Sequence, residues 1–150
     1  MIFVTVGTTD FDQLVELVDR LAPSLLDRVV VQIGNGQYVP RNCEHFRFAP
    51  SLDPYYDEAD IVVAHGGLGI TMELLAKGKK SISVENTTYA DHHQTDILRA
   101  LAREGYLIWC QDLGELPSLL EHAPTMKVRP YVAPPCRIAE VIQGFLSRLG

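Results

Sequence analysis

The stretch IVVAHGGLGITME, residues 61–73, decides the fold of this chain. Its first four residues are apolar and mostly β-branched, which predicts a buried strand. Three glycines in four positions follow, and then an apolar helical pattern with Leu68, Met72 and Leu75 facing inward and Gly78 as the C′ residue. A strand, a glycine-rich turn and a helix in immediate succession are typical of the α/β class, in which helices cover a parallel sheet.

The same alternation runs along the rest of the chain. Strands are predicted at residues 2–6, 28–33, 46–48, 61–64, 81–84 and 106–109, and helices at residues 11–21, 51–59, 68–77, 94–104 and 138–149. The strands are almost continuously apolar, as expected when both faces of a parallel sheet are covered. We therefore predict a single domain over residues 1–150 with a doubly wound, mostly parallel, six-stranded sheet.

The composition limits the function. The 150 residues are 47% hydrophobic and 21% charged, which is usual for one globular domain. The net charge of −6 leaves no broad basic surface and argues against a nucleic-acid partner. The three cysteines form no CxxC pair, which argues against a zinc site. The N-terminus lacks the basic region of a signal peptide, and no apolar run approaches the roughly 18 residues that cross a bilayer. The expected location is cytoplasmic.

Ligands of such sheets bind at the carboxyl ends of the strands, near the switch in strand order. Gly7, Thr8 and Thr9 follow the first strand and either cradle a phosphate or form a tight turn. The GxGxxG fingerprint is absent here, which argues against an NAD enzyme. Residues 10–12 read DFD, a spacing that some metal-dependent sugar transferases use. Aspartate is also favoured at a helix start, with Gln13 completing a capping box, and we prefer this interpretation.

The glycine-rich turn at residues 65–69 is more specific. Glycines between a strand and a helix leave backbone amides free to bind a diphosphate, and His65 is placed to donate a hydrogen bond to it. Glu73, in the second helical turn, is suited to accept hydrogen bonds from two vicinal ribose hydroxyls. The alternatives are a capped core histidine for His65 and a solvated helix face for Glu73.

A long polar segment, residues 85–94, follows the fifth strand. Asp91, His92 and His93 suggest a metal, but adjacent side chains rarely converge on one ion, so no metal site is predicted. Gln94, at the start of the next helix, is suited to bind sugar hydroxyls through its amide. Helix capping by this segment is the alternative.

These segments together resemble the C-terminal, donor-binding domain of glycosyltransferase family 28, the MurG-like group. The likeness is greatest to its short stand-alone members, the catalytic subunits of two-part UDP-sugar transferases of bacterial exopolysaccharide assembly and dolichol-linked N-acetylglucosamine transfer. The matching motifs are FVTVGTT at residues 3–9, QIG at 32–34, HGG at 65–67 with Gly69 and Glu73, and HQ at 93–94. The resemblance implies the Rossmann-like C-terminal half of a GT-B fold, with the acceptor half on another subunit.

The resemblance also implies a role for each site residue. His65 is the expected catalytic residue, which stabilises the charge of the departing UDP. The other residues expected to bind the donor are Gly7, Thr8 and Thr9 in the pocket, Phe48 and Ala49 beside the uracil, Gly66, Gly67, Gly69 and Ile70 at the diphosphate, Glu73 at the ribose, and His93 and Gln94 at the sugar. Ile70 stands where the family often has threonine and offers only its amide.

The expected activity is metal-independent, inverting transfer of a sugar from UDP to a lipid-diphosphate-linked acceptor, without a cofactor. A membrane-anchored partner would bind the acceptor, supply the general base, and recruit the chain to the cytoplasmic face of a membrane; Asp12 is the in-chain alternative as base. The C-terminal helix either docks on that partner or packs on its own sheet. Two other functions remain: a non-catalytic nucleotide-sugar-binding subunit, and a UDP-sugar epimerase, whose chains carry both domains. The transferred sugar is left open.

Overall fold

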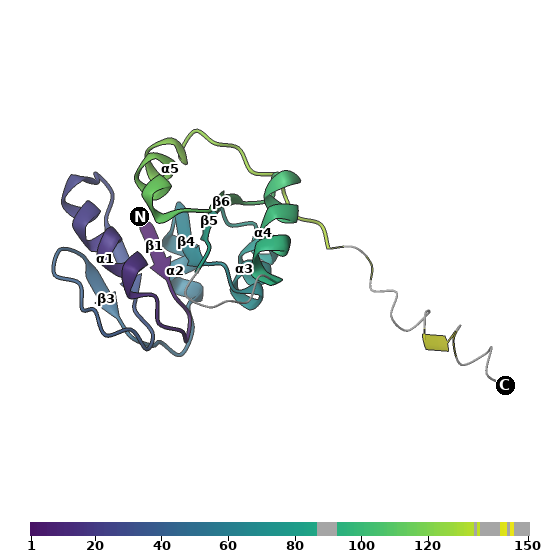
Figure 1. Ribbon diagram of the computed structural model, residues 1–150, viewed down its shortest axis with the longest axis horizontal. Helices are drawn as coiled ribbons and strands as arrows, with labels where there is room; N and C mark the ends of the chain where they lie inside the picture. Colours follow the sequence, from purple (N-terminus) through teal and green to yellow (C-terminus); the bar gives the residue numbers. More distant parts are fainter. Residues whose placement is uncertain (87–92, 134, 136–141, 144, 146–150) are drawn as a thin grey trace.

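The computed structural model describes residues 1–86, 93–133, 135, 142–143 and 145. Within them the chain forms one six-stranded sheet in the order β3-β2-β1-β4-β5-β6 (Figure 1). The strands are β1 Ile2–Thr5, β2 Val29–Gln32, β3 Glu44–Phe46, β4 Ile61–His65, β5 Ser81–Val84 and β6 Ile108–Cys110. Every neighbouring pair is parallel. The predicted doubly wound, six-stranded parallel sheet is confirmed, and its strand order reverses between β1 and β4.

Helices cover both faces of this sheet. They are α1 Asp12–Leu21, α2 Asp53–Glu58, α3 Leu68–Ala76, α4 His93–Arg103 and α5 Leu116–His122. Apolar residues of α1 and α5 pack with Ile2 and Val4 in one core cluster, whereas α2 and α3 pack with Phe3 in the other. Successive β1 side chains thus enter different cores. This explains why the strands are apolar throughout instead of alternating.

The helix after β4 ends as predicted but faces differently. Gly78 has φ +64°, its amide donates to the Leu75 carbonyl, and the Lys79 amide donates to the Leu74 carbonyl. This is the Schellman pattern of a glycine C′ residue. Of the three residues predicted to face inward, Leu75 is buried and Met72 is half-buried, whereas the prediction for Leu68 was wrong. Leu68 is 53% exposed because α3 begins directly above the carboxyl edge of the sheet, where its first turn has no strand beneath it.

Two other segments differ from the expectations. The third strand occupies Glu44–Phe46 instead of residues 46–48, so Phe48 lies in the loop after it. Helix α5 was not predicted. The predicted helix at residues 138–149 lies mostly outside the described residues; Ile142 and Phe145, which are described, are helical and exposed. No helix in the described part of the chain is long and apolar enough to cross a membrane.

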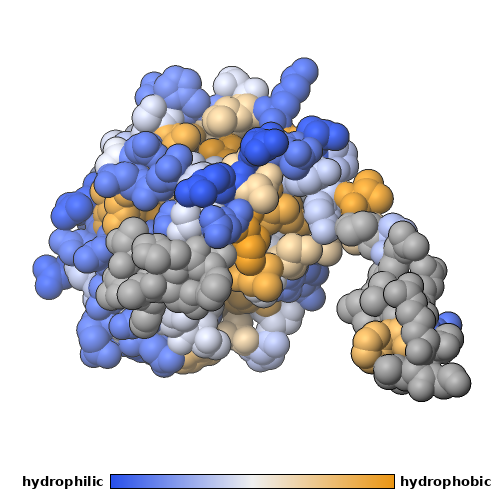
Figure 2. Space-filling view, turned by 45° about the vertical axis from the view of Figure 1, so that its right-hand side comes forward, coloured by the Kyte–Doolittle hydropathy of each residue, from blue (hydrophilic) through white to orange (hydrophobic). Residues whose placement is uncertain are grey.

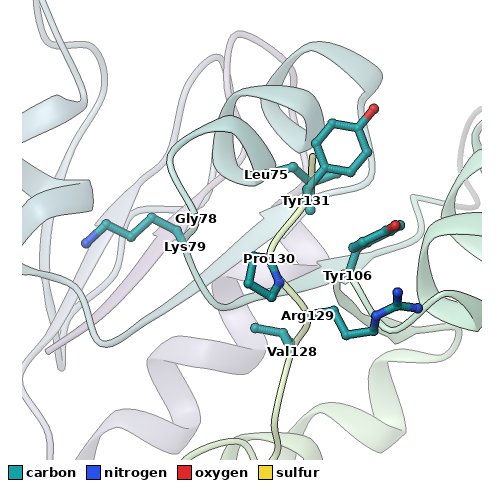
Figure 3. A pocket seen from close by; sticks show the side chains of 8 residues that line it. All are labelled: Leu75, Gly78, Lys79, Tyr106, Val128, Arg129, Pro130 and Tyr131. Atoms are coloured by element: carbon teal, nitrogen blue, oxygen red, sulfur yellow. The ribbon is translucent and has the colours of Figure 1, made fainter. Parts of the chain in front are cut away.

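Residues 124–135 hold four prolines. The continuous described part of this connection, residues 124–133, lies at the amino end of the sheet. Lys80 donates to the carbonyls of Ala123 and Pro124, and the Arg129 amide donates to the Gly105 carbonyl at 2.8 Å. Figure 3 shows the small cavity under this connection, about 110 Å³, where Tyr131 lies edge-on to Tyr106. These contacts hold the connection against the end of the domain opposite the carboxyl edge.

The surface is mixed in polarity. Figure 2 shows hydrophilic residues over much of one face, with apolar surface between them. Among the exposed large apolar side chains, Phe48 and Leu68 follow or begin elements at the carboxyl edge of the sheet. That is the edge where a doubly wound sheet binds its ligands.

A buried carboxylate, Asp19 of α1, fixes the crossover between β2 and β3. It is 1% exposed and accepts hydrogen bonds from the Arg41 and Asn42 amides, at 2.9 and 2.6 Å, and from the Tyr38 hydroxyl at 2.8 Å. Burial alone would raise the pKa of this carboxyl, but the hydrogen bonds, those of the Asn42 and Arg41 amides foremost, lower it below the ordinary value. Ionised Asp19 therefore stabilises the folded chain.

Replacing Asp19 by alanine is expected to lower the free energy of unfolding by about 3 kcal/mol, because the Tyr38 hydroxyl, the Arg41 and Asn42 amides and the Cys43 thiol lose their acceptor. Denaturant unfolding measures the difference, with Asp57→Ala on the exposed face of α2 as the control. A group with a depressed folded-state pKa stabilises above its unfolded pKa, and the effect is lost as the pH falls through the folded value. The gap between wild type and Asp19→Ala should therefore narrow in acid. An equal gap at every pH would contradict a role for the ionised carboxylate.

Candidate functional site

The candidate site lies at the strand switch, where the turn after β1 meets the turn after β4. Gly7 follows β1 with φ +64°, a backbone conformation that glycine adopts without strain. His65 ends β4, and Gly7 and Gly67 both lie against the Cε1–Nε2 edge of its ring. A Cβ atom on Gly7 would stand 2.9 Å from the His65 Cε1 atom, and one on Gly67 would overlap the Nε2 atom. The two glycines thus form the walls of a slot that holds the imidazole.

His65 is half-buried, and its Nδ1 atom is buried. Burial lowers the pKa of His65 below its ordinary value, and an interaction with the Thr5 backbone partly opposes this shift. No hydrogen bond of good geometry reaches the buried Nδ1 atom from the described residues. The ring is therefore neutral at pH 7, and an anion beside it would restore the proton that burial disfavours.

The N-terminus of α3 lies next to this ring. Its N-cap residue, Gly67, has no side chain to cap the helix, and the first helical hydrogen bond comes from the Thr71 amide to the Gly67 carbonyl at 3.1 Å. The amides of residues 68–70 belong to the first turn, whose N–H groups have no partner within the helix. Leu68 and Gly69 are exposed, and Ile70 is half-buried. Helix N-termini of this kind bind phosphate groups.

The Gly7–Thr9 loop is braced by the loop after β2. Asn35 donates from its side chain to the Thr8 carbonyl at 2.6 Å and from its amide to the Thr9 carbonyl at 3.2 Å. Gly34, with φ +51°, leaves no room for a Cβ atom because both the Gly7 and Thr9 carbonyl oxygens would lie 2.6 Å from it. Thr8 is exposed, whereas the Thr9 hydroxyl donates to the Val6 carbonyl. This packing fixes the loop in place.

The DFD segment, residues 10–12, also contacts the loop after β2. Helix α1 begins at Asp12, its N-cap residue is Phe11, and no side chain caps it, so the predicted Asp10–Gln13 capping box was wrong. The Asp12 carboxylate instead accepts a hydrogen bond from the Gln37 amide at 3.0 Å. It is thus directed at the loop after β2.

The remaining predicted residues lie in the loop after β3, on α3 and on α4. Phe48 is 54% exposed and Ala49 half-buried in the loop after β3. Glu73 is exposed on α3, close enough to Tyr56 that its charge adds to the effect of burial in raising the pKa of that hydroxyl. Gln94 is half-buried in the first turn of α4.

The polar segment after β5 is described only at its ends. Asp91 and His92 lie outside the described residues, and His93 is placed as the first residue of α4. The Thr95 hydroxyl donates to Glu85, and the Asn86 side chain donates to the Asp10 carbonyl at 3.4 Å. These pairs tie both ends of the segment to the carboxyl edge.

Sequence reasoning missed several of these supports. Gln32, Asn35, Glu85 and Asn86 received no role, yet each fixes a loop of the edge. Gln32 left a signal in the sequence: it is a polar residue at the end of an apolar strand, and it is only 4% exposed. In the described part of the chain, no group of three histidine, cysteine or acidic residues is arranged to hold a metal ion.

A parallel sheet in this strand order, with a glycine turn and a helix N-terminus at its switch point, has the arrangement of Rossmann-like domains. The sequence model of the glycosyltransferase family 28 C-terminal domain matches residues 1–139. The chain belongs to this family, and its fold is the Rossmann-like C-terminal half of a GT-B glycosyltransferase.

Curated relatives agree with this family. The human UDP-N-acetylglucosamine transferase subunit ALG13 is 36% identical over 124 residues, which are 73% of this chain and 11% of that protein. The subunit of the same name from Yarrowia lipolytica is 27% identical over 140 residues, 81% of this chain and 71% of that protein. The chain therefore spans about a tenth of the human relative and most of the yeast one.

Solved structures share the fold. The solution structure of ALG13 matches 97% of this chain and 94% of its own, with a TM-score of 0.62 and 22% identity. The crystal structure of Acinetobacter baumannii MurG matches 98% of this chain and 49% of its own, with a TM-score of 0.66 and 20% identity. The chain thus corresponds to about one half of the MurG chain.

Proposed function

We propose that this chain is the donor-binding, catalytic subunit of a two-part UDP-sugar transferase. The observation that carries the proposal is the N-terminus of α3 beside the His65 slot, at the strand switch, where the glycine N-cap supplies no side-chain cap among the described residues. Uncapped helix amides and an imidazole together suit a diphosphate. The family membership supports a nucleotide-sugar donor, and the names of the ALG13 relatives favour UDP-N-acetylglucosamine among the sugars.

The chemistry follows from where charge develops. As the sugar leaves, negative charge grows on the diphosphate of UDP. The amides of residues 68–70 and the His65 ring are fixed before the reaction, so they stabilise that charge without reorganising. The acceptor hydroxyl attacks from the opposite side and inverts the anomeric carbon, while a general base takes its proton. In this scheme His65 acts on the leaving group, UDP, and no metal ion is required.

We further propose that a second polypeptide supplies the acceptor half. Both relatives are named as subunits, which agrees with this division. The partner would hold a lipid-diphosphate-linked acceptor at the cytoplasmic face of a membrane and carry the base. Because Asp12 is engaged with the loop after β2, it is the weaker candidate for that base.

Calorimetric titration of the chain with UDP, UDP-N-acetylglucosamine and UDP-glucuronic acid tests the donor site. We expect micromolar to millimolar binding, weakened roughly tenfold in Glu73→Ala, because that carboxylate would lose two ribose hydrogen bonds. Glu121→Ala, which removes an exposed glutamate near the far end of α5, is the matched control. Absence of binding both to the chain alone and to the chain co-purified with a partner would overturn the proposal.

Donor binding is also expected to raise the pKa of His65. Burial lowers it in the free chain, and a diphosphate beside the ring favours the charged form. NMR titration of the His65 ring protons, with and without UDP, should show the midpoint moving upward, so that UDP binding takes up a proton near neutral pH. The exposed His45 ring serves as the internal reference. If UDP left the midpoint unchanged, the His65 ring would not lie beside the bound diphosphate.

A further inference from the structure

We propose that Gln32 is a positioning residue of the donor site, whose single side-chain amide sets the separation between the turn after β1 and the loop after β3. The inference rests on the proposed function, because it assumes that a uridine diphosphate extends from the His65 slot toward Phe48. Gln32 need not touch the ligand. It acts through the two loops that would.

The contacts of Gln32 join two loops. Its Nε2 atom donates to the Gly7 carbonyl at 2.9 Å and to the Arg47 carbonyl at 3.3 Å. Gly7 is a wall of the His65 slot, and Arg47 directly precedes Phe48. One NH₂ group thus donates one hydrogen to each loop, so neither loop can move outward without breaking a hydrogen bond.

The other end of the amide is fixed by Thr5. Residues 5 and 32 are register partners on neighbouring strands, and the Thr5 hydroxyl donates to the Gln32 Oε1 atom. The same hydroxyl accepts from the Gly7 amide at 3.2 Å. Thr5 and Gln32 are 0% and 4% exposed, so water cannot replace these bonds. The result is a closed ring of hydrogen bonds from Gly7 through Thr5 to Gln32 and back to Gly7, in which each bond orients the next.

The ring of hydrogen bonds also fixes the orientation of the Gln32 side-chain amide. Two carbonyl oxygens require the NH₂ group on their side, and the donating hydroxyl requires the oxygen on the other. A glutamate at position 32 has the same shape, but when ionised it turns an oxygen toward the Gly7 and Arg47 carbonyls, with no proton to donate. Protonation restores one donor. Position 32 therefore offers a pH-dependent test that a merely space-filling residue would not.

The test measures UDP affinity by calorimetry for the full chain, together with its partner if the partner is required. Gln32→Leu keeps the bulk and removes every hydrogen bond; we expect UDP affinity to fall roughly tenfold or more at every pH. Gln32→Glu should be as weak near pH 8 but recover toward the wild-type value as the pH falls to about 5.5, because burial raises the pKa of such a carboxyl. Affinities are compared with wild type at the same pH, which cancels the titrations of UDP and His65.

Thr5→Val breaks the ring from its other end without changing side-chain shape, and the same loss of affinity is expected. Ser83→Ala is the control, since its hydroxyl is equally buried in β5 and makes no hydrogen bond to the described residues. Circular dichroism shows whether each variant is folded. A single folded variant at Gln32 or Thr5 is sufficient to test the inference. The inference would be overturned if the folded Gln32→Leu and Thr5→Val variants bound UDP within twofold of wild type. It would also be overturned if the UDP affinity of Gln32→Glu changed with pH in parallel with that of wild type. Neither result would contradict the proposed function. Failure of wild type to bind UDP would overturn the proposed function, and the inference with it.

Discussion

Replacement of His65 by alanine is expected to lower the turnover of the assembled transferase at least about 100-fold, the usual cost of removing one group that stabilises developing charge. The ring lies in its slot in the free chain, so it is in place before the charge on UDP develops. The effect should fall on turnover at saturating donor more than on donor affinity, because the charge on UDP grows toward the transition state. Initial rates with and without the partner subunit measure both quantities.

His45→Ala is the matched control, since this histidine is exposed on β3 and no role is assigned to it. The fold of His65→Ala is checked by its melting temperature. Added imidazole is expected to recover part of the lost rate, because the two glycine walls leave a ring-shaped space once the side chain is gone. Wild-type turnover in His65→Ala would contradict the assignment of the catalytic residue.

The fold was largely predictable because its signals are local. The apolar strands and the glycine turn after β4 follow from residue pattern alone, and the alternation of strands with helices indicates a parallel sheet. Gly78 ends α3 as its position in the sequence predicted. These features depend on neighbours along the chain, which is what a sequence displays directly.

The incorrect predictions concern segments whose structure depends on tertiary contacts. Strand β3 is an edge strand of three residues, placed by its pairing with β2 and not by its own apolar content. Leu68 has the spacing of an inward residue but lies above the end of the sheet. Helix α5 is only seven residues long and begins with proline in its first turn, so its helical periodicity is too brief to recognise.

The candidate site shows the same division. The turn that carries His65 was recognisable from its glycines, whereas the ring formed by Thr5 and Gln32 was not. Those two residues lie 27 positions apart and meet only through the register of β1 and β2. A sequence shows that Gln32 is polar in an apolar strand, but only the register shows which loops it joins.

Replacement of Gly67 by alanine is expected to be as damaging as loss of His65, about 100-fold in turnover or more. Gly67 has φ −64° and ψ 139°, which alanine adopts freely, so the backbone is not the cause. The added methyl group would overlap the His65 Nε2 atom, and Gly7 already lies close to the neighbouring Cε1 atom, which limits how the ring can shift. Either the imidazole leaves its slot or the first turn of α3 shifts, and both changes separate His65 from the amides. Turnover and UDP affinity measure the loss.

Gly69→Ala is the matched substitution two residues on, where a Cβ atom would meet nothing within 4 Å. It should leave stability unchanged or raise it by up to about 1 kcal/mol, because alanine favours helix. Gly67→Ala should lower stability by roughly 1–3 kcal/mol through overpacking. A double-mutant cycle separates this clash from a general defect: in a His65→Ala background the ring is gone, and Gly67→Ala should cost little further stability. Additive losses in that cycle would mean that Gly67 acts on something other than His65.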